Sequence, residues 1–248
     1  KQAKLCAESH PPREITAEEP GQRLYSDVLT IREPSVGGNR YCLTLIDEWS
    51  GYVWLQFLAR KSDVASRLQS ILLMLDKKIP GGVLALRTDN GGEYLKASFT
   101  EWLRVQGIKH ERTTPYTPQA NGRAERMNRT LLEKTRLHLA RGKLDKALWA
   151  EIMSTVGYLH NRLPTVTRST SPFEAFHGWR PSLRHLKPIG ARGFMHLRPE
   201  ERNDKINLPS RQVILVGYED GARSIYRVWD PDTRSVRRTS QFVLCEDQ

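Results

Sequence analysis

The sequence predicts an α/β domain, with a mixed five-stranded sheet and helices on both of its faces, followed by a small all-β barrel. Three observations lead to this prediction. Strand-like runs rich in β-branched and aromatic residues alternate with amphipathic stretches through the first two thirds of the chain. Their order is three strands, a helix, a strand, a helix, a strand and then helices. From Gly190 onward only short strand-like runs occur, at regular spacing.

The first three strands are expected at residues 22–29, 40–47 and 51–58, where β-branched and aromatic content favours an antiparallel meander. Ser62 is a candidate N-cap for the next helix. Apolar residues from Val64 to Leu75 recur at helical spacing and give that helix one apolar face.

Further strands are predicted at 83–88 and 108–113, separated by a short helix at 98–106, and longer helices at 123–141 and 148–163. This element order is that of a ribonuclease-H-like fold. In that topology the first and fourth strands are neighbours, so side chains on the two strands can meet.

The C-terminal strands are expected at 193–197, 213–218, 224–229 and 236–244, and the absence of a predicted helix between them indicates a barrel. These patterns divide the chain into four segments. They are an extended, proline-containing leader at 1–20, the α/β core at 21–165, a basic linker at 166–189 and the barrel domain at 190–248.

The composition favours a polyanionic partner. The 248 residues carry a formal net charge of +11, and lysine and arginine side chains on a surface bind the phosphate backbone of nucleic acids. No apolar run approaches the roughly 20 residues that span a bilayer, so we expect no membrane partner. The three isolated cysteines form neither a disulfide framework nor a CxxC zinc motif, which suits a reducing compartment.

Three acidic residues are the candidate catalytic groups. Asp27 lies within the apolar run LYSDVL, Asp89 ends the fourth strand, and Glu125 lies near the start of a helix. Carboxylates that converge without matching basic groups repel one another, and a divalent metal is the usual way to hold them together. Two such ions can activate an attacking oxygen and stabilise a leaving oxygen in phosphoryl transfer.

Each acid also has a purely structural interpretation. Asp27 would then be an edge-strand charge, Asp89 part of a tight Asp-Asn-Gly-Gly turn, and Glu125 a surface acid paired with Arg129. Asp47 is a rival carboxylate at another strand end, but we expect it to cap the adjoining turn.

The spacing of these acids resembles the D,D-35-E triad of retroviral and retrotransposon integrases. More narrowly, the motifs YSDV, TDNGGEY, TPQANGRAERMNRTL, LWAE and YLHNRLP resemble the copia-type long-terminal-repeat retrotransposon integrases. The segment VGYEDGARSIYRVWDP resembles the SH3-like module of the same proteins. In that family a zinc-binding domain precedes the core, and the opening Lys1-Gln2-Ala3-Lys4 resembles the residues directly after that domain. We therefore expect no zinc site in this chain.

The resemblance implies a function. The chain would be a DNA integrase that uses two Mg²⁺ or Mn²⁺ ions, held by Asp27, Asp89 and Glu125, to join the 3′ ends of element cDNA to host DNA. It implies a homo-oligomer, a tetramer on paired ends, as well as assembly in a cytoplasmic virus-like particle and action in the nucleus. The DNA-contacting residues it implies are Gln119, Asn121, Arg123, Arg126, Asn128 and Arg129.

Two other functions stay open. The chain could be a catalytically silent nucleic-acid-binding protein derived from a retrotransposon, although a binding module has no need of all three acids. A ribonuclease-H-type hydrolase shares the fold and metals, but the loop TPYTPQANG and the terminal barrel favour the integrase. Trp229 with Arg227, Arg237 and Arg238 forms either a nucleic-acid-binding face on the barrel or a core residue with solubilising neighbours.

Overall fold

The computed structural model describes residues 17–113, 122–164, 168–198, 200, 209–222 and 224–245. The first sheet has the strand order β3-β2-β1-β4-β5. β1, β2 and β3 form an antiparallel meander, whereas β4 pairs in parallel with both β1 and β5. The sheet is therefore mixed, as the sequence predicts. Its strands are β1 (Arg23–Thr30), β2 (Tyr41–Asp47), β3 (Val53–Leu58), β4 (Ala85–Thr88) and β5 (Lys109–Arg112).

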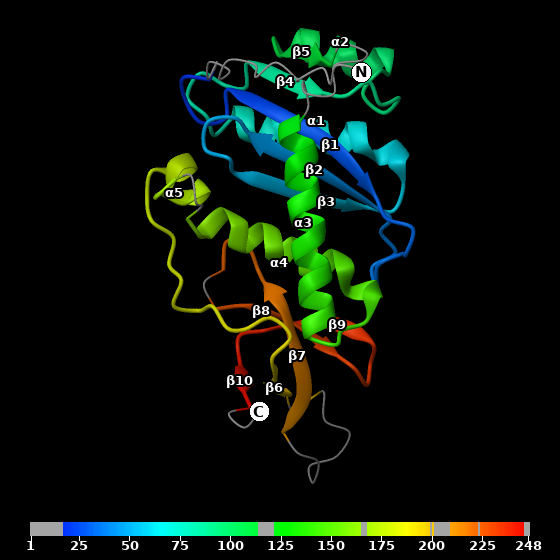
Figure 1. The fold of residues 1–248 in the computed structure, drawn as a ribbon, viewed down its shortest axis with the longest axis vertical. Coiled ribbons are helices and arrows are strands. Elements are labelled where there is room, and N and C mark those ends of the chain that lie inside the picture. The colour runs from blue at the N-terminus through cyan, green and yellow to red at the C-terminus, as the bar shows by residue number, and fades with distance from the viewer. Residues whose placement is uncertain are drawn as a thin grey trace, which may run out of the picture.

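Helices cover both faces of this sheet (Figure 1). Alternate residues of β1 point to opposite faces, so Leu24 packs in a core with α1 and α2, and Tyr25 packs in a second core with α3 and α4. These helices are α1 (Val64–Asp76), α2 (Ala97–Val105), α3 (Gly122–Arg141) and α4 (Trp149–Arg162), with short 3₁₀ turns η1 (Lys61–Asp63) and η3 (Lys146–Leu148) before α1 and α4.

The pairing of β1 with β4 brings two of the predicted acids to one place. The parallel register places Tyr25 opposite Arg87. Asp27 lies two residues further along β1, on the side of the sheet that faces α3, and Asp89 lies two residues beyond Arg87, directly after β4. The expectation that the first and fourth strands are neighbours is confirmed.

The second sheet is all-antiparallel, with the order β10-β6-β7-β8-β9. The single strand predicted at 236–244 is wrong, because it divides into β9 and β10. Thr239 Oγ1 donates to the carbonyl of Gln241 and accepts from its amide, and this local turn interrupts the strand. The strands are β6 (Arg192–His196), β7 (Ser210–Tyr218), β8 (Tyr226–Asp230), β9 (Ser235–Thr239) and β10 (Phe242–Leu244), and a short helix, α5 (Pro172–His177), precedes them.

Helix α4 lies between the two sheets and binds the second one through ion pairs at both of its ends (Figure 1). Near its start, both Glu151 carboxylate oxygens accept hydrogen bonds from Arg227 of β8, at 2.7 and 2.8 Å. At its end, the Arg162 guanidinium pairs with Asp220 at 3.0 Å. Arg227 therefore binds α4 rather than a nucleic acid. The predicted nucleic-acid-binding face on the barrel loses one of its three arginines.

Between these ion pairs the contact is close. Thr155 Oγ1 donates to the carbonyl oxygen of Val216 at 2.7 Å, and the Tyr158 ring stacks on Tyr218 with centroids 5.1 Å apart. A Cβ atom at Gly217 would lie 2.2 Å from Thr155 Oγ1, so no larger residue fits there. The two sheets thus share α4 as a common support.

One helix start differs from the prediction. Ser62 lies inside η1 and donates to the Asp63 carboxylate, and Asp63 occupies the N-cap position of α1 without a side-chain cap. Ser62 is therefore not the cap of this helix. Among the described residues, no helix has the length and apolarity needed to cross a bilayer.

Candidate active site

Asp27 is held in a fixed orientation on β1. Its Oδ1 accepts a hydrogen bond from the amide of Val28 at 2.8 Å, and its Oδ2 accepts one from Asn128 Nδ2 of α3 at 2.9 Å. The side chain is half-buried between the sheet and α3. Both hydrogen bonds leave lone pairs on each oxygen, because a carboxylate has about four acceptor positions.

Asp89 comes directly after the last residue of β4, where the chain leaves the sheet. Its Oδ1 accepts from the amide of Gly91 at 2.9 Å, and its carbonyl accepts from Thr88 Oγ1 at 2.8 Å. Asn90 ties the same turn to β5 through the carbonyl of Thr113. The turn interpretation of Asp89 is therefore correct, and it is compatible with a ligand role because Oδ2 makes no hydrogen bond within the described residues.

Glu125 lies in the first turn of α3 and is exposed to solvent. The apolar side of the same turn packs inward through Ala124, which is completely buried in the core with Tyr25. Packing of Ala124 fixes the helix start against β1, while Glu125 has freedom to turn toward the other two acids.

The charges of Asp89 and Glu125 act on Asp27. Burial raises the pKa of Asp27, the negative charges of Asp89 and Glu125 raise that pKa further, and the hydrogen bonds from Val28 and Asn128 oppose the rise. Charges that act on a carboxyl group in this way lie near it. The structure therefore brings Asp27, Asp89 and Glu125 into one region, from three separate elements.

The donor chemistry of this region fits a hard divalent cation. Carboxylate oxygens are the ligands that Mg²⁺ and Mn²⁺ prefer, and a cation would relieve the repulsion that raises the pKa of Asp27. The side chains are not gathered into a closed ligand cage, however. Within the described parts of the chain, no group of three or more His, Cys, Asp or Glu has the geometry to hold a metal ion.

Asn128 lies inside the protein, although the sequence placed it among the DNA-contacting residues. It is 5% exposed, and Thr44 Oγ1 donates to its Oδ1 at 2.6 Å while its Nδ2 donates to Asp27. Thr44 also lies directly opposite Asp27 in the β1–β2 register. A side chain so buried offers no surface to DNA, and we assign it instead to orienting Asp27.

The basic residues predicted to contact DNA lie near this site on α3. Arg126 and Arg129 are exposed and Arg123 is partly exposed, within the same helix as Glu125. Gln119 and Asn121 lie outside the described residues, so their predicted role stays a prediction.

Asp47 is excluded as a member of the site. It is completely buried, its Oδ1 accepts from the amide of Gly21, and its Oδ2 accepts from the amide and hydroxyl of Ser50. These bonds close the turn after β2, which confirms the expected capping role.

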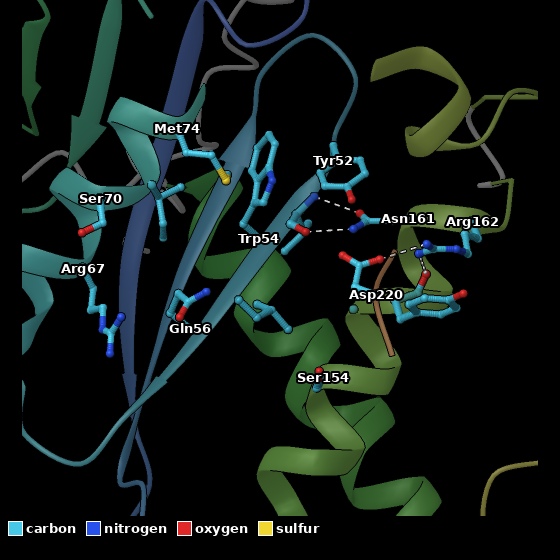
Figure 2. A pocket seen from close by; sticks show the side chains of 15 residues that line it. Tyr52, Trp54, Gln56, Arg67, Ser70, Met74, Ser154, Asn161, Arg162 and Asp220 are labelled. Atoms are coloured by element: carbon cyan, nitrogen blue, oxygen red, sulfur yellow. Dashed lines mark hydrogen bonds and ion pairs between the residues drawn. The ribbon is translucent and has the colours of Figure 1, made fainter. Parts of the chain in front are cut away.

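A cavity of about 400 Å³ in the described part of the chain lies away from the acids. It lies at the β3 edge of the sheet, where β3 passes between α1 and α4 (Figure 2). Tyr52, Trp54, Met74 and Arg162 line it, and Asn161 closes one end by bonding both backbone groups of Val53.

Comparison with known proteins agrees with this architecture. Residues 17–118 match the integrase core domain, and residues 191–248 match the retroviral polymerase SH3-like domain. The chain is 39% identical over 227 residues to the retrovirus-related Pol polyprotein from transposon TNT 1-94 of Nicotiana tabacum, which is 91% of this chain and 17% of that protein. It is 32% identical over 205 residues to that of transposon RE2 of Arabidopsis thaliana, covering 82% and 14%.

Among solved structures, a chain of the simian T-cell lymphotropic virus intasome in complex with PP2A regulatory subunit B56 gamma is similar, with a TM-score of 0.53 and 18% identity. The match covers 93% of this chain and 78% of that one and supports the fold.

The chain therefore carries an integrase core of the polynucleotidyl transferase superfamily, with a ribonuclease-H-like fold, followed by a retroviral polymerase SH3-like domain. It spans less than a fifth of the length of these two plant polyproteins. Within the superfamily it belongs to the integrases of copia-type retrotransposons. The core match ends before Glu125, so the assignment of that residue depends on the geometry described above.

Proposed function

We propose that this chain catalyses DNA strand transfer, joining the 3′ ends of element cDNA to host DNA at Asp27, Asp89 and Glu125. The observation that supports this most directly is that the charges of Asp89, just after β4, and Glu125, at the start of α3, both act on Asp27 of β1. Structural acids would be expected to have basic partners, whereas the charges that act most strongly on Asp27 are negative.

In this reaction a terminal 3′-hydroxyl attacks a phosphorus atom of the target strand. A new phosphodiester bond forms, the bond to the target's own 3′ oxygen breaks, and that oxygen leaves with a proton. The number of phosphodiester bonds is unchanged, so no nucleophilic side chain and no covalent protein intermediate are required.

Asp27 and Asp89 would hold one divalent cation, and Asp27 and Glu125 a second. The integrase core family depends on divalent metal ions, and such ions activate the attacking oxygen and stabilise charge on the leaving oxygen. The chain's own part is to present the oxygens. Asn128 and the amide of Val28 fix the Asp27 carboxylate, and the Asp89 turn fixes the second.

The exposed arginines of α3 would bring the phosphate backbone to these acids. Arg126 and Arg129 are on the same helix as Glu125, and neither forms an ion pair within the described residues. A lone cation on a surface neutralises phosphate at little desolvation cost. We extend the proposal to a tetramer on paired cDNA ends and to action in the nucleus after assembly in a cytoplasmic particle.

A strand-transfer assay tests the function. It uses a terminal-repeat oligonucleotide, a plasmid target and the full chain, with Mg²⁺ or with EDTA. Asp89→Asn and Glu125→Gln should each abolish joining while retaining most DNA binding. Glu133→Gln is the matched control, because it removes the same charge from an exposed site on the same helix and should retain joining. Full joining by either of the first two variants would remove that residue from the mechanism.

The alternative is a catalytically silent DNA-binding protein, in which the exposed arginines of α3 contact DNA without chemistry at the acids. Such a protein would bind the same DNA equally well with Mg²⁺ and with EDTA. It would join no ends under either condition.

A further inference from the structure

A stack of two guanidinium groups on one tyrosine ring lies beside the acidic site. The Arg87 guanidinium carbon is 5.6 Å from the centroid of the Tyr25 ring, and that of Arg123 is 5.9 Å away. These residues come from β1, β4 and the start of α3, the same three regions that carry the acids. Each precedes the acid of its own region by two residues.

Two members of the stack are firmly anchored in the sheet. Tyr25 is 4% exposed, and its hydroxyl donates to Glu48 Oε1 at 2.6 Å. Arg87 pairs with Glu111 of β5 through Nη2 at 2.8 Å and Nε at 3.1 Å, and its side chain is 14% exposed. Arg23 binds the same Glu111 and also pairs with Glu48, which closes a network across β1, β4 and β5.

Arg123 is held differently. Within the described part of the chain, its guanidinium forms no hydrogen bond or ion pair, and it contacts the Tyr25 ring. The first turn of a helix has unsatisfied backbone groups and frays readily. A contact from this turn to a buried ring on β1 therefore limits where the turn can lie.

We infer that Tyr25 and Arg123 are positioning residues, which hold the first turn of α3 against β1 so that Glu125 can reach Asp27 and Asp89. The inference rests on the proposed function for its catalytic meaning. Its structural part stands on its own, because the stack should order the helix start whether or not a metal binds.

The direction in which cation affinity changes when Arg123 is replaced separates a positioning role from a purely electrostatic one. Arg123 is a positive charge near a proposed cation site, so its removal alone should strengthen cation binding. If Arg123 instead positions Glu125, its removal should weaken cation binding. A cation–π contact is modest, so the loss should be about two- to tenfold in affinity.

The first measurement is Mn²⁺ binding to the full chain by calorimetry, without DNA, so that DNA contacts cannot contribute. We expect weaker binding in Arg123→Met, near wild-type binding in Arg123→Lys, which keeps a cation over the ring, and unchanged binding in the control Arg136→Met, an exposed arginine further along α3. Tyr25→Phe keeps the ring and should also bind normally. Asp89→Asn shows whether the measured ion is bound at the acids, which tests the proposed function separately.

The second measurement is hydrogen exchange of the peptide that covers the start of α3. Exchange there should be faster in Arg123→Met than in the wild type, and unchanged in the second half of the helix. The exchange measurement tests the positioning role even if Mn²⁺ does not bind. Arg123→Met also leaves the buried Tyr25 unchanged. Unchanged exchange in Arg123→Met, or Mn²⁺ binding equal to or tighter than wild type, would overturn the positioning role.

Discussion

Asn128→Asp is the sharpest test of the contact between α3 and Asp27. The substitution keeps the shape of the side chain and keeps an acceptor for Thr44, but it puts a second carboxylate where the amide now donates to Asp27 at 2.9 Å. At an effective dielectric constant of about 20, two charges at this distance repel by about 6 kcal/mol. The pair would instead take up one proton, as closely spaced carboxylates do.

The cost of that proton sets the magnitude. Keeping a carboxyl with an ordinary pKa near 3.9 protonated at pH 7 costs at most about 4 kcal/mol, at about 1.4 kcal/mol per pH unit. The variant should therefore lose up to about 4 kcal/mol of unfolding free energy at pH 7, and only about 1.5 kcal/mol at pH 5. Urea unfolding at several pH values measures both.

The exchanged double variant provides the control. In Asp27→Asn/Asn128→Asp the amide at position 27 donates to the carboxylate at 128, and Thr44 keeps its acceptor. The pair then carries one negative charge, as in the wild type and one fewer than in Asn128→Asp, and every hydrogen bond is kept. The double variant should be more stable than Asn128→Asp, and this difference should exceed the difference between Asp27→Asn and the wild type. The double variant should nevertheless bind no Mn²⁺. A pH-independent loss in Asn128→Asp, or no such coupling, would refute this account of the contact.

Three further outcomes are expected from the same structure. The stability of Asp27→Asn relative to the wild type should be greatest at pH 8 and should fall as the pH is lowered, because the raised pKa of Asp27 means that its charge opposes folding above that pKa; urea titrations at several pH values check this. Arg129→Ala should flatten the slope of log K against log salt by about 0.9 in DNA-binding anisotropy, and an unchanged slope would place Arg129 on a solvated face. Glu151→Arg and Arg227→Glu should each lower the melting temperature, and the two reversals combined should restore part of the loss, whereas additive losses would show that this pair does not couple the sheets.

Much of the architecture is set by local patterns. Strand and helix positions in the core were predictable because each element buries one face, and the neighbouring placement of Asp27 and Asp89 is a consequence of the topology. Asp47 was separable from these acids because a strand end with Ser50 and Gly51 just after it favours a capped turn.

The position of Asn128 was missed because the family resemblance grouped it with Arg129 as a DNA-contacting pair. A signal was nevertheless present, since Ala124, Asn128 and Leu131 lie at helical spacing and are all buried. The face of α4 toward the second sheet was harder to predict. Glu151, Thr155, Tyr158 and Arg162 also lie at helical spacing, but a polar stripe normally indicates solvent, and its partners lie far along the chain.

That face of α4 bears on how the protein should be dissected. A fragment that stops after the ribonuclease-H-like core would leave Glu151 and Arg162 without their counter-charges and Tyr158 without its stacking partner. A fragment of the SH3-like part alone would expose Val216, which packs in the same core as α3 and α4. Either half expressed by itself should therefore be poorly soluble and prone to aggregation. The smallest unit suited to biochemistry extends from β1 to β10.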